Sequence, residues 1–250
     1  MFRALSALAT AMVLSLATVG CITTEAERQQ ADALRELGLT YLHEGHTPDA
    51  IDMLQQSLEL NPKDARTHHE LGLAYFSREI YPEAEASMLR GLELDPKLSE
   101  ARLNLSSLYI ASGRYQDAID QLNLIVSDPL YRRPHRAHNN LGWAHYKLGQ
   151  YEQAETAYRK ALKLAPGFCQ AHFNLALVME ATSRPDLAAK QFQRAVEKCP
   201  NDGRYQLEYA AILMRMERFG EAIPYLERVS AADPDGLLGD RAREYLQVVP

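Results

Sequence analysis

The stretch ARTHHELGLAYFSREIYPEAEASMLRGLELDPKL, residues 65–98, decides the fold of this chain. Small residues stand inside it at Gly72 and Ala84, where two helices can approach more closely than larger side chains would allow. Pro96 ends the second helix, because proline lacks an N–H and disfavours helix in the residue before it. The stretch therefore predicts a pair of antiparallel helices, neither of which can bury its apolar face alone.

The same residue types recur along the chain with a period of 34. The small alanine recurs at Ala50, Ala84 and Ala118 and, after a two-residue insertion, at Ala154, Ala188 and Ala222. Prolines recur at Pro62 and Pro96 and later at Pro166, Pro200 and Pro234. A 34-residue period with these residue types resembles the tetratricopeptide repeat (TPR) family.

That resemblance implies an all-α fold, a right-handed superhelical solenoid of six tetratricopeptide repeats with a C-terminal capping helix. The insertion near residues 128–134 is interpreted as a tolerated surface loop, with a functional lip as the alternative. The expected segments are a signal peptide 1–20, a polar tether 21–30, repeats 31–64, 65–98, 99–134, 135–168, 169–202 and 203–236, and the capping helix 237–250.

The N-terminus predicts export and lipidation. Residues 4–19 are almost wholly apolar and follow Arg3; they are short for a membrane span of about 20 residues and fit a signal peptide. The following Thr18-Val19-Gly20-Cys21 resembles the lipobox of bacterial lipoproteins, although Thr18 stands where that pattern prefers Leu. Lipidation of Cys21 is therefore expected. A plain secretory signal or an uncleaved anchor is the alternative.

The lipoprotein resemblance also implies a location. Lipidated Cys21 would carry enough acyl chain to anchor the protein stably to a membrane. In such lipoproteins Asp after the Cys favours retention in the inner membrane, and this chain has Ile22 there. We therefore expect a protein anchored at the periplasmic face of the outer membrane.

The sequence lacks the patterns of a nucleic-acid-binding protein or an enzyme. The net charge is −6, and no Lys/Arg run offers a footprint for phosphates. His43 and His46 have the wrong spacing for a two-His zinc helix, and no phosphate-binding Gly-rich loop or nucleophile elbow appears. We expect no catalysis, no metal and no cofactor. The histidines at position 4 of their repeats are interpreted as packing residues: His68, His138 and His172.

Cys169 and Cys199 predict a disulfide. They stand at positions 1 and 31 of the fifth repeat, and a helical hairpin brings its first and last residues to the same end. The signal peptide places them in an oxidising compartment. Two buried free thiols are the alternative.

The concave side of the solenoid is the expected binding surface. In the TPR family it is lined by positions 2, 5, 9 and 12 of each first helix. A mostly apolar groove there would fit an amphipathic helix or an extended apolar peptide. The alternative is that position 12 packs between neighbouring first helices. The candidate groove residues are Arg35, Leu39, Leu42, Leu73, Phe76, Leu103, Ile110, Asn139, Trp143 and Tyr146.

The layout of a lipoprotein signal followed directly by six repeats resembles the type IV pilus pilotins, the PilF/PilW/Tgl group, and looks closest to Tgl. Asn139-Asn140-Leu141-Gly142 resembles the middle repeats of that group, and late cysteines are also similar. The resemblance implies a monomer that binds the type IV pilus secretin and promotes its insertion and multimerisation, in support of pilus assembly and social motility. The alternatives are a scaffold for peptidoglycan synthase regulation or outer-membrane protein assembly, and an enzyme with an unrecognised site.

Overall fold

The structure, a computed structural model, describes residues 24–249, so the predicted signal peptide and Cys21 lie outside it. The described part is all helical, and none of its helices is long and apolar enough to cross a bilayer. The helices are α1 (Glu25–His43), α2 (Thr47–Leu60), α3 (Ala65–Ser77), α4 (Tyr81–Leu94), α5 (Ser99–Ala111), α6 (Tyr115–Val126), α7 (Pro134–Lys147), α8 (Tyr151–Leu164), α9 (Cys169–Ala181), α10 (Pro185–Lys198), α11 (Gly203–Arg215), α12 (Phe219–Ala232) and α13 (Leu237–Gln247).

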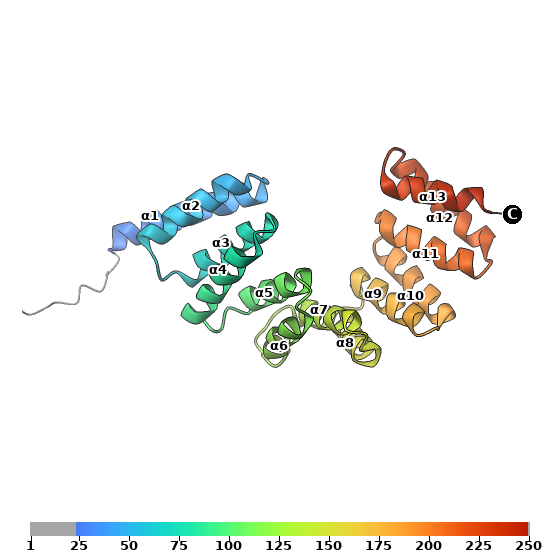
Figure 1. Cartoon of the computed structure of the whole chain (residues 1–250), viewed down its shortest axis with the longest axis horizontal. Coiled ribbons are helices and arrows are strands. Elements are labelled where there is room, and N and C mark those ends of the chain that lie inside the picture. The colour runs from blue at the N-terminus through green and yellow to red at the C-terminus, as the bar shows by residue number, and fades with distance from the viewer. Residues whose placement is uncertain (1–23, 250) are drawn as a thin grey trace, which may run out of the picture.

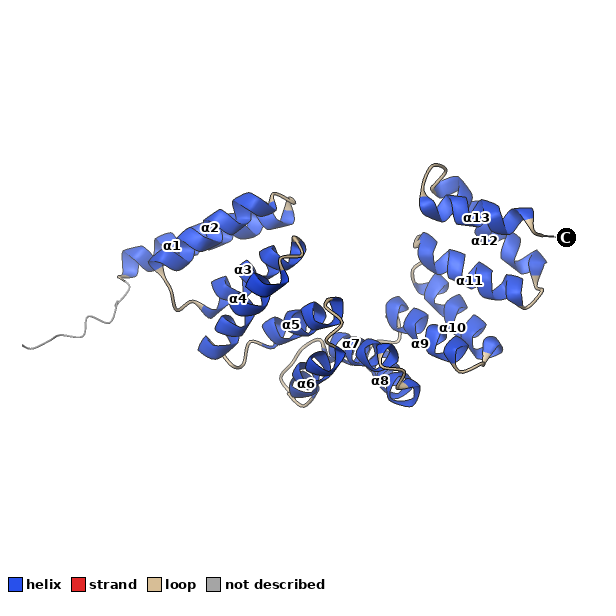
Figure 2. Ribbon diagram, viewed as in Figure 1, coloured by secondary structure: helices blue, strands red, loops and turns tan. Residues whose placement is uncertain are grey.

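Consecutive helices pack as hairpins, and the hairpins follow one another along an arc (Figure 1). The first helices α5, α7 and α9 lie toward the inside of this arc, and α6, α8 and α10 lie toward the outside. Figure 2 shows helices joined by short loops along the whole described chain. The predicted all-α solenoid is therefore confirmed.

Small side chains at the helix crossings allow each hairpin to close. A Cβ atom on Gly72 would lie 2.6 Å from Cγ of Met88 and 3.0 Å from the carbonyl oxygen of Ala84. Ala84 and Met88 are both fully buried. Because interiors are packed as densely as organic crystals, such a crossing has no room for even one more methyl group.

The buried side chains form three successive clusters along the solenoid. A small cluster around Leu54 joins the first two repeats, a second runs from Ala84 to Ala144, and the largest runs from Ala154 to Ala242. All buried hydrophobic residues of the described chain lie between Ala31 and Ala242. Residues 24–250 therefore contain the whole described core.

The structure differs from the prediction at the expected tether. Helix α1 begins at Glu25, so residues 25–30 are helical. The cause is a capping box: the backbone N–H of Glu27 donates to the Thr24 hydroxyl over 3.2 Å, and the Thr24 N–H donates to the Glu27 carboxylate over 2.7 Å. These bonds satisfy amide groups that a helix start leaves free, and they extend α1 by nearly two turns.

The inserted loop is held against the rest of the solenoid. The Asp128 carboxylate accepts bonds from the Ser99 hydroxyl over 3.2 Å and from the Leu130 N–H over 2.9 Å. Tyr131 is buried, whereas the Leu130 side chain is 84% exposed. The loop therefore has an ordered base and an exposed apolar tip.

Candidate functional site

The candidate groove residues all lie on the first helices α1, α3, α5 and α7, which makes a shared inner wall possible. Two of them are buried and cannot line an open surface. Leu103 is 1% exposed inside the second core cluster, and Asn139 is 4% exposed. Their assignment to the groove is corrected here, because side chains at position 5 turn toward the next repeat and are covered by it.

Most of the apolar candidates pack at the edge of the core. They are partly buried and contact one of the three clusters: Leu42, Leu73, Phe76, Ile110 and Tyr146. This arrangement matches the alternative that position 12 packs between neighbouring first helices. These side chains are thus shared between the core edge and the surface of the inner wall.

Two apolar candidates, Leu39 and Trp143, are partly exposed and belong to none of the three clusters of the described chain. The Trp143 ring stacks on Tyr146 at 5.3 Å between centroids, and the Lys147 ammonium lies 4.9 Å from the centre of the Trp143 ring. Partly exposed tryptophan side chains are frequent anchors of protein interfaces. Leu39 and Trp143 are the partly exposed candidates that pack against none of the three clusters.

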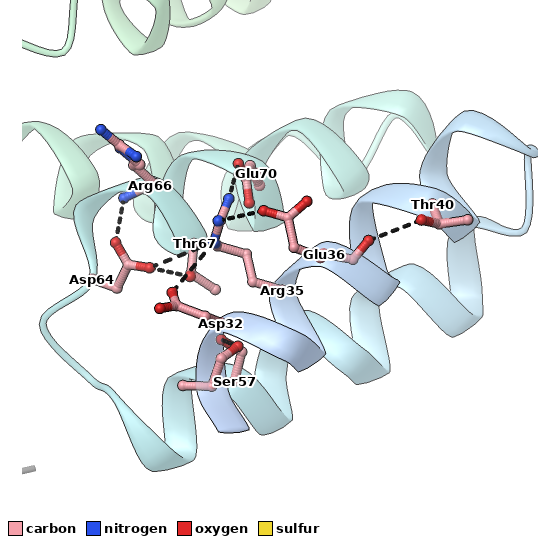
Figure 3. A network of polar contacts seen from close by, with 10 residues as sticks. Asp32, Arg35, Glu36, Thr40, Ser57, Asp64, Arg66, Thr67 and Glu70 are labelled. Carbon is pink, nitrogen blue, oxygen red and sulfur yellow. Dashed lines mark hydrogen bonds and ion pairs between the residues drawn. The ribbon is translucent and has the colours of Figure 1, made fainter. Parts of the chain in front are cut away.

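Arg35 is engaged within the protein (Figure 3). Its guanidinium donates to Glu70 over 3.1 Å and to Glu36 over 2.6 Å, and its Nε lies 3.9 Å from both Asp32 and Asp64. The Arg35 side chain is only 14% exposed. A partner carboxylate would have to displace these contacts, so Arg35 serves as a link between the first two repeats.

Burial raises the pKa of the linked Glu70 carboxyl to about 7, although Arg35 pulls it down. Desolvation disfavours the charged form of a buried acid. The Glu70 carboxyl in this link therefore takes up a proton more readily than a free glutamate does.

A row of polar bonds joins successive first helices, and it was not predicted. Asn104 donates to His69 over 2.8 Å, and Asn174 donates to Asn139 over 3.0 Å. Each pair, like Arg35 and Glu70, is separated by 35 residues and joins position 5 of one repeat to position 6 of the next. Further bonds between first helices join Ser107 to Asn140, Glu180 to Arg215 and, at the end, Glu208 of α11 to Arg241 of α13.

The signal for this polar row was present in the sequence as complementary polar residues 35 positions apart, one more than the repeat length. Burial lowers the pKa of His69 to about 4, so its ring is neutral and can accept from Asn104. Buried polar groups that are fully bonded fix the relative position of their elements. The polar row therefore fixes the register between neighbouring repeats, which is a structural role rather than a role in binding a partner.

Cys169 and Cys199 are joined by a disulfide in the structure, with their Cα atoms 6.0 Å apart. Cys169 begins α9 and Cys199 directly follows α10, so the bond closes the open end of the fifth hairpin.

The histidines have structural contacts. The His172 ring lies within hydrogen-bond distance of Gln191 at 2.8 Å and of the Pro166 carbonyl at 3.2 Å. His135 packs edge-on against Phe168. Over residues 24–249 no group of three His, Cys, Asp or Glu side chains is placed to hold a metal ion.

The fold and the repeat chemistry define the class of this protein. A family model described as tetratricopeptide repeat matches residues 70–132 and 139–203, and a second, described as TPR repeat, matches residues 38–79. The chain belongs to the tetratricopeptide repeat family, whose members mediate protein–protein interaction.

Among curated proteins, the chain is similar to the type IV pilus assembly protein PilF of Pseudomonas aeruginosa. The two are 30% identical over 109 residues, which cover 44% of this chain and 42% of that protein. The chain thus aligns with less than half of the length of this relative.

Two solved structures have the same fold over nearly their full length. The Pseudomonas aeruginosa PilF structure has a TM-score of 0.75 and 21% identity, and covers 88% of this chain and 99% of its own. The structure of PilW, described as a widely conserved type IV pilus biogenesis factor, has a TM-score of 0.78 and 20% identity, with 85% and 97% covered.

Proposed function

We propose that this protein is a type IV pilus biogenesis factor that acts as a pilotin. It is an outer-membrane lipoprotein, anchored through Cys21 on the periplasmic face, and it binds the pilus secretin. Binding promotes insertion of the secretin into the outer membrane and its multimerisation, which pilus assembly and pilus-driven motility require. The function needs no catalysis, because the free energy comes from the surface buried between the two proteins.

One observation carries this proposal: the chain is 30% identical over 109 residues to the type IV pilus assembly protein PilF. The fold that it shares with PilF and PilW, at TM-scores of 0.75 and 0.78, agrees with the same assignment. TPR folds are shared by many proteins, so the fold alone does not name the partner.

The inner wall is the proposed contact surface for the secretin. Leu39 on α1 and Trp143 on α7 offer exposed apolar area that the core does not use. A segment of the secretin that presents an amphipathic helix or an extended apolar strand would cover them. Aromatic anchors of this kind contribute most of the binding energy in many interfaces.

The test is complementation of a strain that lacks the gene, with secretin multimers in the outer membrane as the readout. Leu39→Glu combined with Trp143→Glu should prevent multimer formation, because a carboxylate cannot be buried against an apolar partner. The matched control is Leu89→Glu combined with Leu124→Glu, on the exposed faces of α4 and α6. The control variant should restore multimers like the wild type.

Circular dichroism and cellular abundance of both variants establish that the solenoid still folds. Normal secretin multimers with the inner-wall variant would disprove the contact surface, and normal multimers in the deletion strain would disprove the pilotin function.

The anchor is tested separately by a pull-down from detergent-solubilised outer membrane with wild type and Cys21→Ala side by side. The wild-type protein should be in the membrane and should capture secretin, and Cys21→Ala should leave the membrane fraction. Capture of a peptidoglycan synthase or of outer-membrane assembly factors, without secretin, would favour the alternative scaffold function.

A further inference from the structure

A pocket of about 500 Å³ lies between the outer helices α8 and α10, away from the inner wall. Its rim carries Arg159 and Lys163 from α8 and Arg194 and Lys198 from α10. In each pair the residues are four positions apart, which places them on one face of their helix. Each of the two outer helices thus contributes two cations to the same pocket.

These cations have few counter-charges. Over residues 24–249, no carboxylate lies within 4.0 Å of the charged nitrogens of Lys163, Arg194 or Lys198, while Arg159 bonds Glu155 over 2.8 Å. Glu197 also lines the pocket, so the three cations without an ion pair meet one carboxylate at the rim. Uncompensated like charges around a hollow repel one another, and an anion relieves that repulsion.

The position of each cation within its helix tells whether the helix C-terminus by itself explains why the cation is there. Lys163 and Lys198 lie in the last turns of α8 and α10, where cations also stabilise the free carbonyl groups. Arg159 and Arg194 lie one turn earlier, where that effect has faded. Arg159 is paired with Glu155 on its own helix, whereas Arg194 has no ion pair among the described residues, so neither the helix C-terminus nor an ion pair accounts for Arg194.

The outer surface elsewhere has the opposite charge. Helix α2 carries Asp49, Asp52 and Glu59 and no Lys or Arg, and α6 carries Asp117 and Asp120 and no Lys or Arg. In a chain of net charge −6, the exposed cations of the outer helices are concentrated on α8 and α10. The fourth and fifth repeats therefore carry most of the positive charge of the outer surface.

The floor of the pocket is apolar and fixed. Leu162, Leu175 and Pro166 form most of it, together with the ring of His172, which is bonded to the Pro166 carbonyl and to Gln191. The disulfide between Cys169 and Cys199 ties α9 to the end of α10, and both helices line the pocket. A rigid apolar floor below an Arg/Lys rim is complementary to a phosphate ester with a small organic group.

We propose that the pocket between α8 and α10 binds a phosphate ester, carried either by the headgroup of an anionic phospholipid or by a soluble molecule. The guanidinium group of Arg194 provides the planar donors that match phosphate oxygens, and the ammonium groups of Lys163 and Lys198 add compact charge. Arg159, whose Nε and Nη2 donate to Glu155, adds positive charge at the rim.

The test uses residues 24–250, which contain the whole described core, with two probes. One probe is glycerol 3-phosphate, measured by calorimetry, and the other is phosphatidylglycerol in phosphatidylcholine vesicles, measured by co-sedimentation. Arg194→Gln combined with Lys198→Gln should weaken binding about 25-fold, since each cation next to an anionic surface contributes about fivefold. Circular dichroism verifies that the variant folds.

The matched control is Lys160→Gln combined with Lys190→Gln, which removes the same charge from the same two helices outside the pocket. It should retain binding. Binding of both probes or of vesicles alone supports the site with a lipid source, and binding of glycerol 3-phosphate alone supports it with a soluble source. Equal losses in both variants, no binding of either probe, or equally tight binding of poly-glutamate would overturn the proposal.

Discussion

The closest helix crossing of the fourth repeat gives the sharpest test of how the repeats close. A Cβ atom on Gly142 would lie 2.7 to 2.9 Å from three ring carbons of Tyr158, which is fully buried and has no room to move aside. Gly142→Ala should therefore cost about 1 to 3 kcal/mol by overpacking, offset by the 0.5 to 1 kcal/mol or so that Ala gains over Gly in a helix. The expected net loss is about 1 to 2 kcal/mol.

Combining the change with Tyr158→Leu should remove the penalty. The sixth repeat already pairs Ala210 with Leu226 at these two positions, and both are fully buried. In the Tyr158→Leu background Gly142→Ala should be neutral or stabilising, so the two changes should couple by about 1 to 3 kcal/mol.

The assay is urea unfolding followed by circular dichroism for the wild type, both single variants and the double variant. Gly220→Ala is the control, because a Cβ there meets nothing within 4 Å and should stabilise slightly. Additive effects within about 0.5 kcal/mol would refute the steric explanation of the repeat pattern.

Three further predictions concern stability. Replacing both Cys169 and Cys199 by Ala should lower the unfolding free energy by about 3 to 4 kcal/mol, because the bond spans 30 residues; an unchanged urea midpoint would count against it. Tyr158→Phe should stabilise by about 1 to 3 kcal/mol, because its buried hydroxyl has no partner among the described residues; a loss of stability would contradict this. Burial holds the pKa of His69 at about 4 in the folded protein, below its value in the unfolded chain. As the pH decreases below the unfolded value, the unfolded chain binds the proton first, and the free energy of unfolding decreases. From about pH 7 to about pH 5 the wild type should lose about 2 kcal/mol relative to His69→Gln, measured by urea unfolding.

Much of the fold follows from side-chain size at repeated positions. Gly72 and Ala84 predict a close helix crossing from sequence, because only hydrogen or a methyl group fits there. The start of α1 was predicted too late, since Thr24 and Glu27 form a capping box that was interpreted as tether. That signal was local and could have been recognised.

The candidate groove was harder to predict than the fold. Periodicity places a residue on a helix face, but it does not tell how far the next repeat covers that face. Leu103 and Asn139 have the same register as exposed groove positions of the TPR pattern, yet the following hairpin buries both. The cations of α8 and α10 show the converse, because residues of different repeats share a pocket only after the hairpins stack.

The sequence by itself determined the helical hairpin, its 34-residue repetition and the cysteines that meet at the end of the fifth hairpin, because these depend on residues within a single repeat. The tertiary structure alone decided which side chains of the inner wall stay open and which polar groups link neighbouring repeats. It also decided where the charges of the outer helices converge. These features depend on the rotation between successive hairpins, and that rotation is set by packing across the interface of two repeats rather than by any one of them.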